Sequence, residues 1–191
     1  MSTAAPRPKA TSADLTAAGG DPFAEIINGV VVEKASPSAE HGATQAALVA
    51  TLWQRFHNRR GGGPGGWWIL TEVEVELETH ETYRPDVVGW RRDRVPERPA
   101  GRPVRTRPDW VCEVLSASNA DNDLVTKFRG YHRNGVPHYW LLDPESRTLI
   151  VYRWSEAGYV AVLTAKRDET VRAEPFDAIE LSVGLLFDEL D

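Results

Sequence analysis

The stretch PDWVCEVLSASNADNDLVTKFRGYHRNGVPHYWLLDPESRTLIVYRW, residues 108–154, predicts a buried strand, then a helix, then a pair of strands. Its first part, PDWVCEVLS, is a short apolar run typical of a central strand covered on both faces. From about residue 120 to 134, Leu124, Phe128 and Tyr131 recur at helical spacing, and the following glycine and proline form a typical helix stop. The turn DPES then separates two further strands.

The residues upstream predict a hairpin and a long helix. FAEIINGVVVEKAS has two apolar runs around Asn28-Gly29, a pair that readily adopts the positive φ angles of a tight turn. From Ser38 to about Arg59, Leu48, Leu52 and Phe56 share one helical face, and Ser38 is a suitable N-cap.

More strands are expected on either side of the 108–154 stretch. WWILTEVEVEL alternates between apolar residues and the four glutamates Glu72, Glu74, Glu76 and Glu78, so we expect the glutamate face to point to solvent. RPDVVGW is expected to be its partner strand. GYVAVLTAK, ETVRAE and LSVGLLFDEL add short β segments near the end of the chain.

The order of these elements predicts an α/β (α+β) fold, with a mixed β-sheet flanked by helices and additional β-hairpins. The chain has 191 residues, which suits one hydrophobic core. Residues 1–20 are small, polar and without periodicity, so we expect a disordered N-terminal tail followed by a single domain over residues 21–191.

The composition indicates a soluble globular protein, with 41% hydrophobic and 26% charged residues and a net charge of −6. The single cysteine, Cys112, excludes an intrachain disulfide and a zinc site built on paired cysteines. We expect Cys112 to be buried and to point away from the face that carries Glu113. No apolar run approaches the roughly 18 residues of a membrane span, and the N-terminus lacks the apolar segment of a signal peptide. A cytoplasmic protein with no membrane partner is therefore expected.

The residues best suited to chemistry are Asp86 in RPDVVGW, Glu113 in the central strand, and Lys127 on the following helix. Two carboxylates at facing strand ends can hold a divalent cation, and magnesium needs few protein oxygens because it keeps its waters. Such an ion would activate water and neutralise charge on a phosphate, while a nearby lysine could orient the water or stabilise the transition state. An unpaired buried carboxylate at Glu113 would be costly, which favours a functional role there.

These residues resemble the PD-(D/E)XK nuclease superfamily, in which an Asp and a Glu from adjacent strands bind metal beside a catalytic lysine. The chain is more closely similar to the Uma-two family, described as restriction endonucleases, through IINGVVVEKASPSAEHG, YRPDVVGW and residues 108–153. The resemblance covers about residues 22–187. It implies a restriction-endonuclease-like sheet, magnesium or manganese as cofactor, DNA as substrate, hydrolysis of phosphodiester bonds, and a tendency to form homodimers.

The chain departs from the superfamily pattern at Leu115. Positions 113 and 115 share one face of a strand, so the superfamily's lysine would stand where this chain has leucine. Within the Uma-two group the lysine is thought to come from the next helix, and the matching residue is Lys127. The alternative for Lys127 is a surface lysine paired with Asp123, four residues earlier.

Three further residues are candidates for the surroundings of the metal. Asp123 and Tyr131 form one helical stripe with Lys127. His41 lies on the inner stripe of the first long helix, seven residues before Leu48, and is either a hydrogen-bonded core residue or part of the site.

A basic segment, RRDRVPERPAGRPVRTR (91–107), carries seven arginines on an otherwise acidic chain. Because it joins the Asp86 strand to the Glu113 strand, it is expected to start and finish near the metal site and to bind DNA phosphates. The alternative is a solvated loop. The candidate phosphate-binding residues are Arg91, Arg92, Arg94, Arg105 and Arg107.

Other functions lack motifs or remain as alternatives. GGGPGG lacks the Lys-Ser/Thr of a nucleotide phosphate loop, so no nucleotide cofactor is expected. Leu115 and the acidic net charge favour a second hypothesis, a nuclease-fold module that binds DNA or a protein without catalysis. A sheet-rich domain that binds a small ligand is a third, with no motif behind it.

Overall fold

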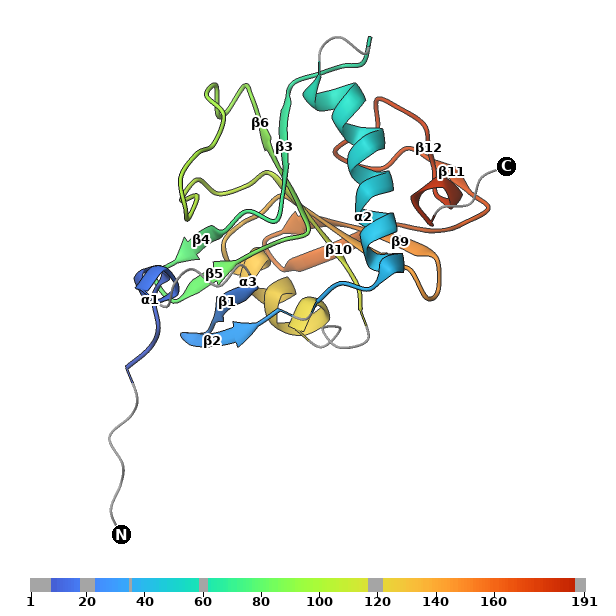
Figure 1. Ribbon diagram of the computed structural model, residues 1–191. Helices are drawn as coiled ribbons and strands as arrows, with labels where there is room; N and C mark the ends of the chain where they lie inside the picture. The colour runs from blue at the N-terminus through green and yellow to red at the C-terminus, as the bar shows by residue number, and fades with distance from the viewer. Residues whose placement is uncertain (1–7, 18–22, 35, 59–61, 117–121, 188–191) are drawn as a thin grey trace.

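The computed structural model describes residues 8–17, 23–34, 36–58, 62–116 and 122–187, with only the backbone of residues 122–124 (Figure 1). The helical segments are α1 (Ser12–Ala17), α2 (Ala39–Leu52), η1 (Trp53–His57), η3 (Asn122–Lys127), α3 (Phe128–Arg133) and η4 (Gly184–Phe187). The strands are β1 (Ala24–Ile27), β2 (Val30–Glu33), β3 (Trp67–Thr71), β4 (Val75–Glu78), β5 (Glu81–Tyr83), β6 (Val87–Arg91), β7 (Trp110–Val114), β8 (His138–Asp143), β9 (Thr148–Ser155), β10 (Gly158–Lys166), β11 (Thr170–Val171) and β12 (Leu181–Ser182). None of the helices so described is long and apolar enough to cross a bilayer.

The central sheet of the described chain has six strands in the order β10-β9-β8-β7-β6-β3. β7 and β8 are parallel, whereas the other neighbouring pairs are antiparallel. A parallel pair needs a crossover connection, and η3 with α3 lie in that connection. This mixed sheet with helices against it confirms the predicted fold class.

A second sheet, built from the N-terminal half of the described residues, has the strand order β2-β1-β5-β4. β1 and β2 form the predicted hairpin, and Asn28 and Gly29 at its turn have φ angles of 54° and 79°. β11 and β12 pair separately as a small antiparallel ribbon. The additional hairpins expected beside the central sheet are therefore present.

The two faces of the central sheet are covered by different elements (Figure 1). Leu48 and Leu52 of α2 pack against Cys112 on one face, so the predicted helix and the predicted burial of Cys112 are confirmed. Ser38 caps α2 by accepting a hydrogen bond from the backbone amide of His41. On the other face, β1, β5 and α3 pack against β6, β7 and β8. Because side chains alternate along β7, Glu113 faces α3 rather than α2.

The prediction that the glutamates of residues 72–78 share one solvent-facing strand face is wrong, although Glu78 itself is exposed. The alternating run is divided between two sheets, since β3 belongs to the central sheet and β4 to the second one. Glu72 lies between them with a positive φ of 54°. Glu74 is buried and pairs with Arg84 at 2.7 Å and with Arg102 at 2.9 Å, which compensates its charge.

The expectation of a disordered tail over residues 1–20 is wrong for residues 12–17, which form α1. Leu15 is 3% exposed and packs with Ala24 and Ile26 of β1. The Ser12 hydroxyl donates to the Glu76 carboxylate. A short segment is therefore ordered by docking onto a neighbouring sheet, although it has no apolar periodicity of its own. Residues 1–7 and 18–20 lie outside the described residues.

The fold makes a testable distinction between two helix glycines. A Cβ at Gly130 of α3 would lie 2.1 Å from the Tyr83 hydroxyl, and Tyr83 is only 1% exposed, so Gly130→Ala is expected to cost about 1–3 kcal/mol. A Cβ at Gly42 of α2 would meet nothing within 4 Å, so Gly42→Ala should stabilise the protein by up to about 1 kcal/mol through helix propensity. Urea denaturation measures both changes, and equal effects would contradict the packing of α3 on Tyr83.

Candidate functional site

The pairing of β6 with β7 brings Asp86 and Glu113 together where β6 begins and β7 ends, at one end of these two central strands. Val87 pairs with Cys112, so the next position in this antiparallel register sets Asp86 opposite Glu113. The amide of Asp86 lies 3.4 Å from Glu113 Oε2, and the amide of Val114 donates to Asp86 Oδ2 at 2.6 Å. Each carboxylate therefore accepts a hydrogen bond from the backbone beside the other.

Asp86 is 1% exposed and is held by cationic and imidazole groups. Its Oδ1 accepts a hydrogen bond from Lys34 Nζ at 2.6 Å and lies 3.3 Å from His41 Nε2. Burial would raise the pKa of Asp86, but the hydrogen bond from His41 and the charge of Lys34 outweigh burial and hold that pKa well below its ordinary value. Asp86 is therefore a carboxylate at neutral pH, as a cation ligand must be.

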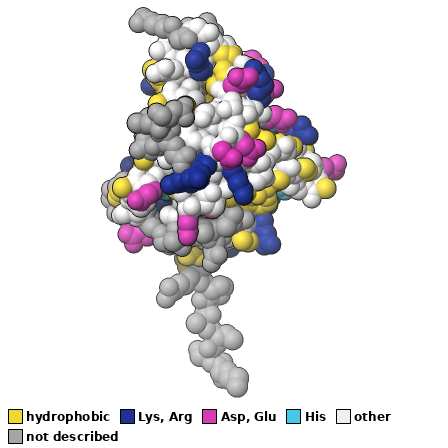
Figure 2. All heavy atoms as spheres, turned by 90° about the vertical axis from the view of Figure 1, so that its right-hand side faces the viewer, with side chains coloured by type: hydrophobic (Ala, Val, Ile, Leu, Met, Phe, Trp, Pro, Cys, Tyr) yellow, Lys and Arg dark blue, Asp and Glu magenta, His cyan; other side chains and the backbone are white. Residues whose placement is uncertain are grey.

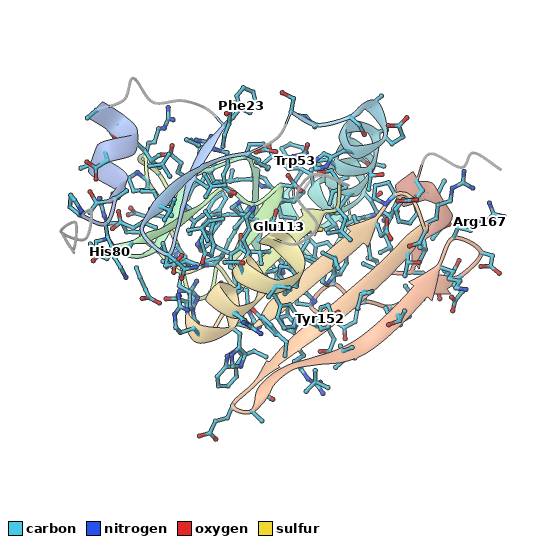
Figure 3. All side chains as sticks on the ribbon, turned by 90° about the horizontal axis from the view of Figure 1, so that it is seen from below. Phe23, Trp53, His80, Glu113, Tyr152 and Arg167 are labelled. Carbon is cyan, nitrogen blue, oxygen red and sulfur yellow. The ribbon has the colours of Figure 1, made fainter. Side chains whose placement is uncertain are left out.

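Glu113 has no exposed surface and contacts the helix that follows it. Its Oε1 accepts a hydrogen bond from the Tyr131 hydroxyl at 2.8 Å and lies 3.4 Å from Lys127 Nζ. Burial, followed by the nearby charge of Glu113, raises the pKa of Tyr131 well above its ordinary value, so this hydroxyl keeps its proton. Figure 3 shows Glu113 in the interior of the molecule, whereas His80 and Arg167 lie at its periphery.

Lys127 is 1% exposed and lies between two carboxylates. Its ammonium is 3.0 Å from Glu25 Oε1 of β1 and 3.4 Å from Glu113 Oε1 of β7. Glu25 Oε1 also accepts a hydrogen bond from the Arg84 amide at 2.6 Å, which holds the carboxylate in place. The helix C-terminal to β7 thus delivers a lysine to the Glu113 carboxylate.

Of the residues predicted from the sequence for this site, the structure brings five together. Asp86, Glu113, Lys127, His41 and Tyr131 are joined by the contacts given above. The backbone of Asp123 belongs to η3, but its side chain lies outside the described residues.

Four residues at the site were not predicted. They are Glu25, Lys34, Gln45 and Glu72. Gln45 Nε2 donates to the Asp86 carbonyl at 2.8 Å and to Glu72 Oε1 at 3.2 Å. A signal for Glu25 exists in the sequence, because a glutamate within the apolar run AEII needs a partner as much as Glu113 does. Gln45 lies one helical turn after His41 on the same face of α2, and this spacing is a signal for Gln45 as well.

The arginine segment does not begin and end near this site, and that inference was wrong. Asp86 precedes β6, whereas the segment leaves from the far end of β6, roughly 16 Å away for a strand of five residues. There Arg91 pairs with Asp93 at 2.5 Å and Arg94 pairs with Asp109 at 2.7 Å.

The remaining candidate phosphate-binding arginines also contact the protein itself. Arg92 donates to the carbonyls of Trp67 and His57, and its guanidinium lies 3.8 Å from the centre of the Trp68 ring. Arg105 pairs with Glu76 at 3.0 Å, and Arg107 donates to the Gly135 carbonyl at 2.7 Å. Each of the five arginines therefore has a partner within the protein, and phosphate binding by them stays a prediction.

The side chains at the site suit a hard divalent cation. Asp86 and Glu113 supply two carboxylates, and no group of three or more Asp, Glu, His or Cys residues that could hold a metal occurs in the described part of the chain. Two protein oxygens are enough for magnesium, which retains waters and takes substrate oxygens. The four carboxylates at the site, from Glu25, Glu72, Asp86 and Glu113, outnumber its two ammonium groups, so a cation would find uncompensated negative charge.

A mixed sheet that presents an Asp–Glu pair and a lysine at one edge defines a restriction-endonuclease-like α+β protein. The chain belongs to the Uma2 family, whose sequence profile, described as "Putative restriction endonuclease", matches residues 12–184. Among solved structures, it is similar to "a putative nuclease belonging to DUF820 from Anabaena variabilis ATCC 29413". That match has a TM-score of 0.69 at 23% identity and covers 88% of this chain and 91% of the other. No curated protein matches the chain. The descriptions of the family and of the neighbour both indicate a nuclease.

Proposed function

We propose that this protein is a metal-dependent endonuclease that hydrolyses phosphodiester bonds in DNA. Asp86 and Glu113 hold magnesium or manganese, and Lys127 assists the attacking water. The observation that carries the proposal is that the Glu113 carboxylate contacts both the backbone amide of Asp86 and the ammonium of Lys127, while the Asp86 carboxylate accepts a hydrogen bond from the amide of Val114, next to Glu113. The family description supplies the substrate class.

The chain's own groups prepare the site in a defined way. The Val114 amide orients Asp86, and the Tyr131 hydroxyl orients Glu113. Glu25 positions the Lys127 ammonium, which would offset charge that develops on the phosphate oxygens. When bound, a divalent ion would lower the pKa of a coordinated water and neutralise phosphate charge.

The test is cleavage of supercoiled plasmid DNA by the purified protein with magnesium or manganese, compared with the same reaction in excess chelator. Nicked and linear products that require the metal are expected. Absence of cleavage with either ion, on plasmid and on single-stranded DNA, would remove the enzyme assignment.

A non-catalytic module that binds DNA or a protein is the alternative, and the contacts and burial of Asp86 and Glu113 favour it. Lys34 lies on the Asp86 oxygen that an ion would use, and Asp86 and Glu113 are almost completely buried. Figure 2 shows Lys and Arg side chains interspersed with Asp and Glu on the side of α2 and β11–β12, and no broad basic surface appears among the described residues on that side, which favours a protein over DNA as a partner there. Binding of DNA that needs no divalent ion, together with no cleavage, would favour this alternative.

Cleavage of both strands of a duplex suits a twofold assembly with two active sites, so we expect a homodimer that works on DNA in the cytoplasm. Light scattering of the purified protein should give twice the 21.2 kDa of one chain. A monomer at all concentrations that support cleavage would restrict the proposal to single-strand nicking.

A further inference from the structure

Lys34 immediately follows β2 and is a buried lysine that the sequence did not single out, 9% exposed. Its ammonium lies 2.6 Å from Asp86 Oδ1, 3.1 Å from the Arg84 carbonyl, and 3.0 Å from Glu72 Oε2. Glu72 Oε1 is a further contact, at 3.2 Å. Every atom in these contacts of the Lys34 ammonium is an oxygen. The oxygens belong to two carboxylates and one backbone carbonyl.

This arrangement of oxygens is the kind that a hard cation prefers. Divalent ions of the magnesium and calcium type are bound by carboxylate and carbonyl oxygens. The Lys34 ammonium contacts both kinds at hydrogen-bonding distances, and one of its contacts is an oxygen of Asp86, a proposed metal ligand. The Lys34 ammonium therefore neutralises the Asp86 carboxylate from the position that a divalent ion bound to this carboxylate would take.

The lysine also has an alternative partner toward solvent. The Glu72 side chain is 41% exposed, whereas that of Asp86 is 1% exposed, so Lys34 bridges the outer and the inner carboxylate. Because lysine has a flexible four-carbon stem, its ammonium can move off Asp86 and keep its contact with Glu72. After moving away from Asp86, the Lys34 ammonium would still be paired with the Glu72 carboxylate.

We propose that the Lys34 ammonium is an internal competitor for the cation position, so that a divalent ion binds Asp86 only when Lys34 withdraws toward Glu72. This inference rests on the proposed function, because it takes Asp86 to be a metal ligand. Lys34 offsets part of the carboxylate charge when no ion is bound and lowers the affinity for the ion.

The test compares manganese binding to wild-type protein, Lys34→Met and Lys34→Gln by isothermal titration calorimetry without DNA. Changing a group that contacts a metal ligand typically costs about 10- to 100-fold in metal affinity, and we expect an effect of that size in the opposite direction here because Lys34 competes with the ion. Both neutral variants are expected to bind manganese tighter than wild type by about that factor, and their melting temperatures should rise more on addition of the ion. Lys166→Met removes an exposed lysine at the end of β10 and is the matched control, with unchanged affinity.

Equal or weaker manganese binding in folded Lys34→Met and Lys34→Gln would overturn the proposal. If both variants are unfolded without an ion, refolding in saturating manganese supports it and failure to refold overturns it. Metal-dependent cleavage by wild type together with unchanged affinity in the variants would refute this inference alone. Tighter ion binding in the variants without any DNA cleavage by wild type would refute the endonuclease proposal alone.

Discussion

Glu113→Gln is expected to lower metal-dependent cleavage of plasmid DNA by about 100- to 1,000-fold, because it removes a proposed ligand of the ion that would neutralise transition-state charge, and loss of such stabilisation typically has this size. Glutamine has nearly the same size as glutamate, and its carbonyl oxygen can still accept the hydrogen bond from the Tyr131 hydroxyl. The variant therefore removes one negative charge beside Asp86 and little of the packing. Initial rates of nicking at saturating manganese measure the effect.

Stability distinguishes loss of chemistry from loss of the fold in this experiment. Removing one partner of a buried ion pair costs about 3–5 kcal/mol when a charge is left without compensation. In Glu113→Gln the Lys127 ammonium keeps Glu25 at 3.0 Å, so the loss of unfolding free energy in urea should fall below that range. Glu78→Gln is the matched control, since this carboxylate is 47% exposed and pairs with Arg133, and its cleavage rate should equal that of wild type. A Glu113→Gln protein that cleaves like wild type would exclude Glu113 from the chemistry.

The Asp86–Glu113 pair was predictable because the pairing of two neighbouring strands determines which of their residues lie opposite each other. RPDVVGW carries Asp86 just before its strand and PDWVCEVLS carries Glu113 near the end of its strand, and antiparallel neighbours bring these two positions together. Lys127 needed the resemblance as well, because helical spacing alone is weak evidence for it and leaves a surface pairing with Asp123 as the alternative. The fold class followed from the order of the strands and helices.

The misplacement of the arginine segment has a simple geometric cause. A connection between antiparallel neighbours leaves one strand and enters the next at the same edge of the sheet. Because Asp86 comes before its strand and Glu113 near the end of the next one, both lie at the edge opposite that connection. The direction of the chain alone therefore places the two ends of this connection at the opposite ends of β6 and β7 from the site.

Lys34 and Glu72 could not be predicted from patterns of burial. The alternation of WWILTEVEVEL continues without interruption through Glu72, although the backbone there adopts a positive φ of 54° and passes from one sheet to the other. Nothing in local propensity indicates a positive φ at a glutamate. Lys34 follows a hairpin strand whose other residues are mostly exposed, and its ammonium contacts Glu72, Arg84 and Asp86, which are distant from it in the sequence.

Lys127→Met is expected to separate cleavage from ion binding. The ammonium of Lys127 is 3.0 Å from Glu25 and 3.4 Å from Glu113, and its removal takes positive charge away from the proposed metal ligand. The variant should therefore bind manganese at least as tightly as wild type, because the carboxylates lose a competing cation. Its cleavage rate at saturating manganese should nevertheless fall about 100-fold or more, because the charge that offsets the developing negative phosphate is gone.

This combination of a retained ion and lost cleavage is specific to a lysine that acts on the reacting phosphate or water. A purely structural lysine would weaken both properties together, since misplacing Glu113 disturbs its contacts with the Asp86 amide and the Tyr131 hydroxyl. Calorimetry of manganese binding and nicking rates on the same preparation measure the two quantities, with Lys166→Met as the surface control. Cleavage by Lys127→Met at the wild-type rate would contradict a role for this lysine. Parallel loss of binding and cleavage would reassign Lys127 to holding Glu113 in place.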